Sequence, residues 1–305
     1  MTGYLKRMRV YFGEMFSLPG YLLVAALIYL SVAGFARLAH EKDSGLLSLH
    51  SAAGMGTVFG VFLMMRLMDD LKDREIDKVL FPERPLPSGR VFERDIQGTL
   101  MAAIAAYLLV SVLLGQALWS GLVVLAYLLL MFKLFFVPDI LRRSLPLSLA
   151  THAPIIPLLL LHGFMIFAAE HDISATSLRW HLILPYTAMI WVVIESWEIS
   201  RKIRASAEET EYMTYSRLIG SAGAVLVAGG LQALAVGIAV WFFASLSLSG
   251  VYLGLVLGAL ALVLAANFRF LLRPDPRTAK LRPFCEGFAV LFLAAQVLEF
   301  GWMAR

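Results

Sequence analysis

The stretch Met68–Gly89, MDDLKDREIDKVLFPERPLPSG, places four aspartates within nine residues, directly after an apolar segment of the chain. The four are Asp69, Asp70, Asp73 and Asp77. If the apolar segment continues outward as one helix, a rotation of about 100° per residue brings them into an arc of roughly 100°. Like charges one helical turn apart repel each other, so their convergence requires a counter-charge. The pattern predicts a cation-binding face at the end of this segment.

Two kinds of cation supply such a charge. Mg²⁺ prefers oxygen ligands and is commonly held by one or two carboxylates together with substrate phosphates. No paired cysteines or histidines accompany the aspartates, which argues against zinc. Alternatively, the segment is a solvated helix cap whose aspartates form ion pairs with Arg74, Lys78 and Arg84. Arg66 lies one turn before the aspartates and points into the same arc.

Three prolines follow the aspartates, at Pro82, Pro85 and Pro87. They forbid continuation of the helix and fix an extended path for the chain. Ser88–Gly89 then provides a turn. This composition predicts a rigid cap beside the carboxylates, with Arg84 close to them.

Long apolar runs dominate the rest of the chain. Hydrophobic residues make up 60% of its 305 residues and the mean hydropathy is +0.77, whereas soluble domains average about 45–50% apolar residues. The runs are roughly 17–25 residues long, the length that crosses a bilayer core of about 30 Å. Nine spans are predicted near 19–39, 51–68, 96–114, 117–137, 146–169, 181–199, 219–244, 249–272 and 284–303. The sequence therefore predicts an all-α integral membrane protein, with residues 1–305 as a single domain.

Lysine and arginine predict which side of the membrane each loop faces. The amino-terminal segment holds Lys6, Arg7 and Arg9, and the even-numbered loops are richer in such residues than the odd-numbered loops. The amino terminus is therefore predicted to be cytoplasmic. The net charge of +4 describes this membrane-facing surface, because no basic patch with interleaved aromatic residues indicates a nucleic-acid partner. The single cysteine, Cys285, excludes an intrachain disulfide.

A second charged segment, Glu195–Arg217, begins where the predicted sixth span ends. Glu195, Glu198 and Lys202 repeat the i, i+3, i+7 spacing of the first segment and fall within an arc of roughly 60°. Carboxylates at the end of a span are functional by default when they face the protein interior. Alternatively, Glu198 and Lys202 form a helical ion pair. Trp191 lies one turn before Glu195 on the same face. The shared spacing suggests a pseudo-repeat in which two equivalent helix ends face each other.

Small residues recur inside two of the predicted spans. Gly56 and Gly60 lie in the second span, and Gly254 and Gly258 lie in the eighth. Glycines four residues apart let membrane helices approach closely. The pattern predicts close helix packing at both places.

Two of these motifs resemble those of the UbiA superfamily of intramembrane prenyltransferases. DDLKDREID at Asp69–Asp77 resembles the family's Asn-Asp-x-x-Asp-x-x-x-Asp motif, with an aspartate in the asparagine position, and RPLPSG at Arg84–Gly89 resembles its cap segment. The family's second motif has three acids at the spacing of the first, whereas the third position here is a lysine. Of the family's Tyr-x-x-x-Lys pattern on the fourth span, Lys133 is present and Leu129 replaces the tyrosine.

The resemblance implies a nine-helix bundle with a central cavity that opens laterally to lipid and a cytoplasmic cap formed near 69–95 and 195–217. It implies a magnesium-dependent transfer of an isoprenyl group from an isoprenyl diphosphate to a small aromatic or lipid acceptor. The carboxylates implied to hold Mg²⁺ are Asp69, Asp70, Asp73, Asp77, Glu195 and Glu198. The side chains implied to contact the diphosphate are Arg84, Lys133 and Lys202, with Arg66 and Arg201 as further candidates.

Asp73, Asp77 and Lys133 are expected to carry the catalytic role. Arg201 lies roughly 100° from Lys202 around the helix and is expected to face away. The resemblance further implies a multi-pass protein of a plasma or inner membrane, with the active site on the cytoplasmic side and membrane lipid around it.

Two alternatives to prenyl transfer remain. The first stays within diphosphate chemistry, as a terpene cyclase or as a transferase of phosphoribose to a polyprenyl phosphate. The second is a non-catalytic carrier of an anionic isoprenoid lipid, because Lys202 removes one carboxylate from the second motif.

Overall fold

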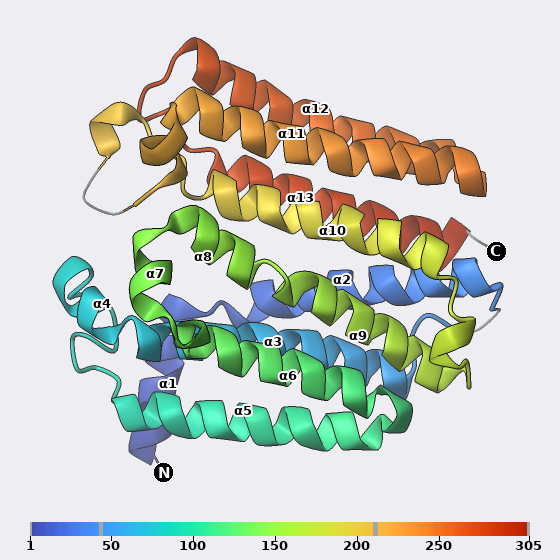
Figure 1. Cartoon of the computed structure of the whole chain (residues 1–305), viewed down its shortest axis with the longest axis horizontal. Helices are drawn as coiled ribbons and strands as arrows, with labels where there is room; N and C mark the ends of the chain where they lie inside the picture. The colour runs from blue at the N-terminus through green and yellow to red at the C-terminus, as the bar shows by residue number, and fades with distance from the viewer. Residues whose placement is uncertain (1, 43–44, 210–212, 304–305) are drawn as a thin grey trace. The chain divides into compact units, whose positions relative to one another are not determined.

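The computed structural model of the chain describes residues 2–42, 45–209 and 213–303, and within these ranges the regular structure is helical, without a β-strand. In chain order the α-helices are α1 Thr2–Met15, α2 Leu18–His40, α3 Leu49–Lys72, α4 Arg74–Leu80, α5 Glu93–Leu113, α6 Leu118–Phe132, α7 Pro138–Arg143, α8 Leu145–His152, α9 Ile155–Glu170, α10 Trp180–Ser200, α11 Tyr215–Leu246, α12 Gly250–Leu272 and α13 Arg282–Leu298 (Figure 1).

The predicted membrane spans are confirmed. Among the described residues, nine helical segments are long and apolar enough to cross a membrane: Leu18–His40, Leu49–Lys72, Glu93–Leu113, Gly115–Phe132, Leu145–Glu170, Trp180–Ser200, Tyr215–Leu246, Gly250–Leu272 and Arg282–Gly301. The largest difference from the prediction is at the end of the fourth span, expected at 137 and found at Phe132. The fold is therefore an all-α bundle of membrane-spanning helices.

Contacts within the chain group the residues into two compact units. Unit 1 consists of Met1–Tyr29, Leu47–Pro138 and His162–Ala175, and unit 2 consists of Leu30–Leu46, Asp139–Leu161 and Thr176–Arg305. The first acidic motif belongs to unit 1 and the second to unit 2.

Helix α3 is the centre of unit 1. It contacts α5 and α6, and these two helices also contact each other; Figure 1 shows the three side by side. The inner face of α3 buries Val58, Val61, Met64 and Leu67, whose spacing of three residues places them on one stripe of the helix. This packing fixes the last turn of α3, which carries the first acidic motif.

A glycine permits the close approach between α3 and the first half of α2. A Cβ atom built on Gly54 would lie 2.0 Å from Cε2 of Tyr29, a ring that is only 1% exposed. No side chain fits at that distance, so position 54 requires glycine as long as the ring of Tyr29 stays in place.

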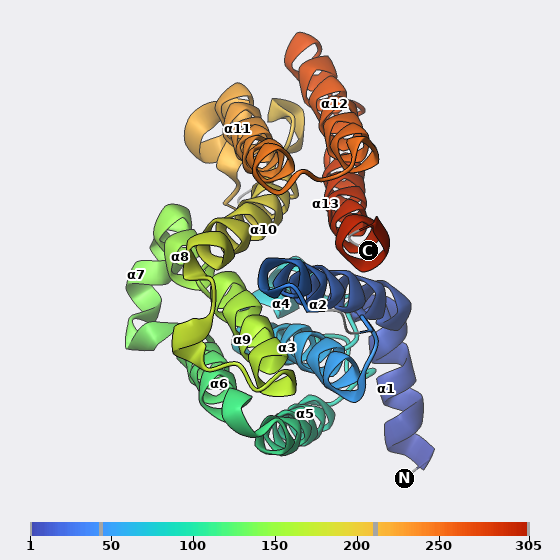
Figure 2. The same ribbon diagram turned by 90° about the vertical axis from the view of Figure 1, so that its right-hand side faces the viewer.

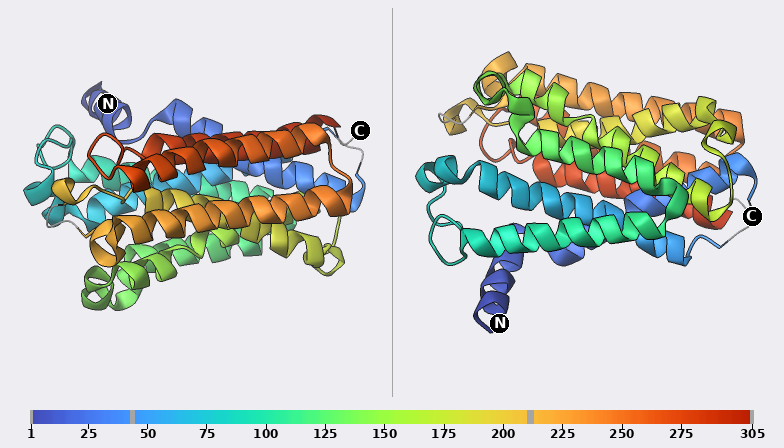
Figure 3. Two further views of the ribbon diagram at one scale, coloured as in Figure 1. Left: turned by 90° about the horizontal axis from the view of Figure 1, so that it is seen from above. Right: turned by 60° about the horizontal axis from the view of Figure 1, so that its bottom comes forward.

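Helices α10, α11, α12 and α13 form a four-helix arrangement in unit 2. Both α10 and α12 contact α11 and α13; Figure 2 looks nearly along the four helices, and Figure 3 shows α12 and α13 side by side. Three buried polar side chains tie this arrangement together. Asn267 donates from Nδ2 to Oε1 of Gln232 at 3.0 Å, and Gln232 donates from Nε2 to Sγ of Cys285 at 3.4 Å. These bonds link α11, α12 and α13.

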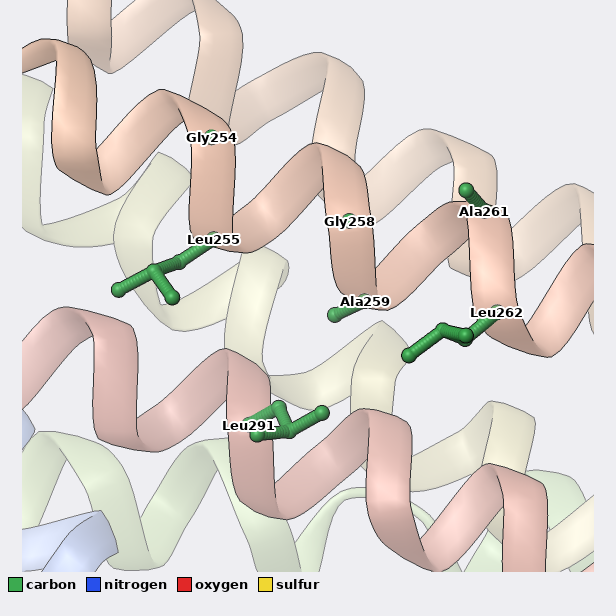
Figure 4. Close-up of a pocket in the computed structure, with 7 residues that line it drawn as sticks. All are labelled: Gly254, Leu255, Gly258, Ala259, Ala261, Leu262 and Leu291. Atoms are coloured by element: carbon green, nitrogen blue, oxygen red, sulfur yellow. The ribbon is translucent and has the colours of Figure 1, made fainter.

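The glycines predicted to pack against neighbouring helices do not all do so. Among the described residues, no atom lies within 4 Å of a Cβ built on Gly56, Gly254 or Gly258. Gly254 and Gly258 instead line a shallow apolar groove together with Leu262 and with Leu291 of α13 (Figure 4). The prediction of close packing is therefore wrong at these three positions, because a glycine pattern reads the same whether it faces a helix or lipid.

Candidate functional site

The first acidic motif spans a junction between two helices. Helix α3 ends at Lys72 and α4 begins at Arg74, with Asp73 between them at φ −96° and ψ 8°. The predicted uninterrupted helix is wrong at this residue. The backbone bonds from Asp73 N to Asp69 O at 2.9 Å and from Asp77 N to Asp73 O at 2.8 Å continue across the junction, so the break is local.

Asp70 is the most enclosed carboxylate of the motif. It is 4% exposed, and it accepts hydrogen bonds from Arg66 Nη2 at 2.5 Å and from the Tyr11 hydroxyl at 2.6 Å. Tyr11 is fully buried, and burial, followed by the negative charge of Asp70, raises the pKa of its phenol. Its hydroxyl therefore stays a donor. The proximity of Arg66 agrees with the sequence prediction, whereas Tyr11 was not predicted, because it lies far from the motif in the sequence.

The two outer aspartates of the motif each form one ion pair, that of Asp69 exposed and that of Asp77 largely buried. Asp69 accepts from Lys72 at 2.8 Å, and its side chain is 54% exposed. Asp77 accepts from Arg84 at 2.8 Å. The cap loop holds Arg84 there through its own turn, in which Ser88 N donates to Arg84 O at 3.0 Å. The predicted position of Arg84 beside the carboxylates is confirmed.

The other basic residues of the cap bind glutamates instead. Arg74 pairs with Glu75 and Glu93, and Lys78 pairs with Glu75 at 3.0 Å. In the alternative prediction, three cap cations pair with the aspartates. Among the ion pairs of the described residues, Arg84 does so, whereas Arg74 and Lys78 pair with glutamates.

Helix α1 is fastened to unit 1 on both sides of Tyr11. Arg7 donates two hydrogen bonds to Asp95, at 2.6 and 2.8 Å, and Arg90 of the cap donates to Glu14. The guanidinium of Arg90 lowers the pKa of the Glu14 carboxyl. These contacts hold α1 against the helices that carry the motif.

Lys133 lies at the end of α6 and is exposed, with Nζ 5.4 Å from the centre of the Phe132 ring. The next three residues, Leu134, Phe135 and Phe136, have positive φ angles of 48°, 51° and 61°. This conformation costs about 1–2 kcal/mol per residue for side chains other than glycine. Strained backbone of this kind is often found at functional sites, which supports a functional reading of the neighbouring lysine.

The two glutamates of the second acidic motif lie in the last two turns of α10, and Lys202 follows the end of the helix. Glu198 accepts from Arg201 at 2.5 Å and from Lys202 at 3.0 Å. The predicted ion pair with Lys202 is confirmed. The expectation that Arg201 faces away is wrong, because its long side chain reaches back three residues to the same glutamate.

Glu195 differs from Glu198 in having one oxygen without a partner. Trp191 donates from Nε1 to Oε1 of Glu195 at 3.0 Å, as their shared helix face predicts. The other oxygen, Oε2, is buried and has no hydrogen-bond partner in the described part of the chain. Buried carboxylate oxygens are normally paired, so this atom is a candidate ligand for a cation.

The donor chemistry of both motifs suits Mg²⁺, which takes carboxylate oxygens as ligands. Among the described residues, no three acidic, histidine or cysteine side chains are grouped as a ready-made metal cage. Sites that use substrate phosphates as further ligands need only one or two carboxylates. Within unit 1, Asp69 and Asp77, each with a single cationic partner, have the chemistry of such a site. Within unit 2, Glu195 offers one unpaired oxygen.

Comparison with known proteins agrees with the motifs. The model of the UbiA prenyltransferase family matches residues 23–293. A structure of digeranylgeranylglyceryl phosphate synthase is similar to this chain with a TM-score of 0.57 and 18% identity, covering 97% of this chain and 99% of that one. A UbiA homologue from Aeropyrum pernix K1 is similar with a TM-score of 0.64 and 17% identity, covering 90% and 96%. No curated protein matches the chain. The family model covers most of the sequence, and the chain therefore belongs to the UbiA prenyltransferase family.

Proposed function

We propose that this protein is a magnesium-dependent intramembrane prenyltransferase, which moves an isoprenyl group from an isoprenyl diphosphate to a small aromatic or lipid acceptor. The observation that carries the proposal is the pairing of motif carboxylates with cap and helix cations, above all Asp77 with Arg84 at 2.8 Å. This pairing supports the proposal because a bound metal diphosphate requires carboxylates and cations close together.

Six carboxylates of the two motifs are expected from the sequence to hold Mg²⁺. In this proposal four of them are the metal ligands: Asp69, Asp73, Asp77 and Glu195. Asp70 and Glu198 are less suited, because each is already bound by two donors from the protein. When bound, Mg²⁺ neutralises the charge that develops on the departing pyrophosphate.

The cations of the site bind the phosphate oxygens. Arg84, Lys133 and Lys202 carry this role, and their positive charges stabilise the leaving group as it forms. In the reaction the bond between the isoprenyl carbon and the diphosphate oxygen breaks, and its electron pair leaves with the pyrophosphate. The isoprenyl carbon bonds to a nucleophilic atom of the acceptor, which releases a proton.

A lipid acceptor is supported by the likeness to digeranylgeranylglyceryl phosphate synthase. The motif residues lie at or next to the ends of membrane spans, which supports entry of the isoprenyl chain from the bilayer. The bias of lysine and arginine supports a cytoplasmic position for the site and for the amino terminus.

The test is product analysis with the purified protein in lipid nanodiscs. Isoprenyl diphosphates of several lengths are supplied with a membrane extract as the acceptor source, with Mg²⁺ or with a chelator. We expect magnesium-dependent release of pyrophosphate together with prenylated products detected by mass spectrometry. Pyrophosphate release that needs no acceptor would indicate a cyclase. Lipid movement between leaflets without any chemistry would indicate a carrier, and either result overturns the proposal.

A further inference from the structure

Three side chains from two helices form a hydrogen-bonded trio inside unit 1. Tyr11 comes from the surface helix α1, and Arg66 and Asp70 come from the last turns of α3. Tyr11 is fully buried and Asp70 is 4% exposed, while the Arg66 side chain is 26% exposed. Arg66 is therefore the most exposed of the three side chains.

Each oxygen of Asp70 has a different donor. Oδ2 accepts from the Tyr11 hydroxyl at 2.6 Å, and Oδ1 accepts from Nη2 of Arg66 at 2.5 Å. Arginine usually binds a carboxylate through two parallel N–H bonds, one to each oxygen. Arg66 makes a single bond to Asp70, on Oδ1, while the Tyr11 hydroxyl lies on Oδ2 and competes there with a second bond from Arg66.

The remaining donors of Arg66 are therefore not consumed by Asp70. Its Nε is buried and has no acceptor within the described ranges of the chain. A buried donor without an acceptor is unfavourable unless a ligand supplies one. Phosphate oxygens are the acceptors that match the planar guanidinium best.

We propose that Tyr11 is a positioning residue for the prenyl transfer proposed above: by occupying one oxygen of Asp70, it holds Arg66 with open N–H groups that bind the diphosphate. Asp70 serves Arg66 in this arrangement and does not bind Mg²⁺. The inference rests on the proposed function, since it requires a diphosphate as the ligand. It adds α1, which lies outside both acidic motifs, to the parts of the chain that determine donor binding.

Helix α1 provides its own control. Tyr4, on the same helix, forms a hydrogen bond with Thr99 at 2.8 Å and lies at an exposed position. Replacing either tyrosine by phenylalanine removes one hydroxyl from α1 and keeps the ring. Tyr11→Phe frees Oδ2 of Asp70 and lets Arg66 close onto both oxygens, whereas Tyr4→Phe leaves the trio intact.

The experiment measures binding without turnover, using the full-length protein in nanodiscs. Inorganic pyrophosphate is titrated in the presence of Mg²⁺ by calorimetry, and Mn²⁺ is titrated by electron paramagnetic resonance as a probe of the metal ligands. For Tyr11→Phe we expect roughly tenfold weaker pyrophosphate binding, the loss of about one charge-assisted hydrogen bond. Tyr4→Phe binds as the parent does. In an Arg66→Gln background, Tyr11→Phe has no further effect.

The metal probe separates Asp70 from its neighbours. We expect Asp70→Asn to keep Mn²⁺ binding and to weaken pyrophosphate binding, and Asp73→Asn to lose Mn²⁺ binding. Equal pyrophosphate affinities for Tyr11→Phe and Tyr4→Phe would overturn the inference, as would loss of Mn²⁺ in Asp70→Asn to the extent seen in Asp73→Asn. A parent protein that binds neither probe contradicts the proposed function itself, which distinguishes the two failures.

Discussion

The two acidic motifs occupy the ends of two membrane helices, yet their charges are balanced in different ways. In the first motif, three separate cations each bind one aspartate: Arg66 one turn earlier, Lys72 within the motif and Arg84 in the cap loop. In the second motif, two adjacent cations, Arg201 and Lys202, share one carboxylate, that of Glu198. One glutamate oxygen in this second motif, on Glu195, is left buried and unpaired.

This difference assigns different tasks to the two motifs. Exposed ion pairs such as that of Asp69 contribute little to stability, so replacing the partner lysine by a metal ion costs little, and the first motif suits metal binding. In the second motif, Lys202 takes the place of a third acid. Its positive charge suits direct contact with phosphate, whereas an acid at that position would bind phosphate only through a metal ion. The following variants test this division, beginning with the largest expected effect.

Asp73→Asn should reduce turnover by roughly 100-fold or more, because it removes charge from a proposed metal ligand at the helix break. Pyrophosphate release in nanodiscs measures the effect. Glu75→Gln is the matched control, since Glu75 lies on the next helix and pairs only with Arg74 and Lys78 among the ion pairs of the described residues. Full activity of Asp73→Asn would remove the first motif from the metal site.

Glu195→Gln should lower activity by roughly 30-fold, within the range for losing a group that tunes a metal site. The same change should leave the thermal unfolding midpoint unchanged or higher, because it replaces a buried, unpaired carboxylate oxygen with a neutral group. Activity and unfolding are measured on the same preparation. Retained activity with a lower midpoint would mean that Glu195 is a structural residue.

Lys202→Ala should raise the KM for the isoprenyl diphosphate about tenfold, the effect of losing one charge-assisted contact. Folding should change little, because Arg201 still neutralises Glu198. The measurement is the rise in unfolding temperature that Mg²⁺ with pyrophosphate produces. It is compared between the parent, Lys202→Ala and the control variant Lys78→Ala. Equal stabilisation of parent and Lys202→Ala would contradict a phosphate contact by this lysine.

Arg201→Ala should have the smallest effect, about threefold or less on the same KM, since exposed ion pairs are worth little. The Arg201 side chain is 41% exposed, compared with 16% for Lys202. A larger rise in KM for Arg201→Ala than for Lys202→Ala would mean that Arg201, and not Lys202, contacts the phosphate.

The membrane spans were predictable because hydrocarbon thickness imposes a length that the sequence displays directly. The cap was predictable because its prolines leave the chain few alternatives. The break at Asp73 was not predictable, because the spacing of the acidic residues fits one continuous helix and does not mark the residue at which the backbone departs from it. Arg201 was misplaced for a related reason, because an angle around the helix ignores how far an arginine side chain reaches.

Tyr11 shows a different limit. Its partner Asp70 is 59 residues away, and no local pattern connects a surface helix with the end of a membrane span. The metal ligands remain a prediction, because a spacing of acids describes which oxygens share a face and not which of them already have partners. Asp70 and Glu195 make this plain, since the sequence treats them alike and the structure gives one two donors and leaves the other an unpaired oxygen.

The close contact between Gly54 and Tyr29 has a consequence for how this sequence can evolve. A methyl group at position 54 would overlap the ring at 29, at 2.0 Å from its Cε2, so the glycine at 54 cannot change while the ring is present. A lineage that gains alanine at 54 must first lose the aromatic ring at 29, whereas loss of the ring by itself leaves a tolerable gap. Substitutions at the two positions should therefore appear in a fixed historical order, with the smaller residue at 29 arising before the larger one at 54.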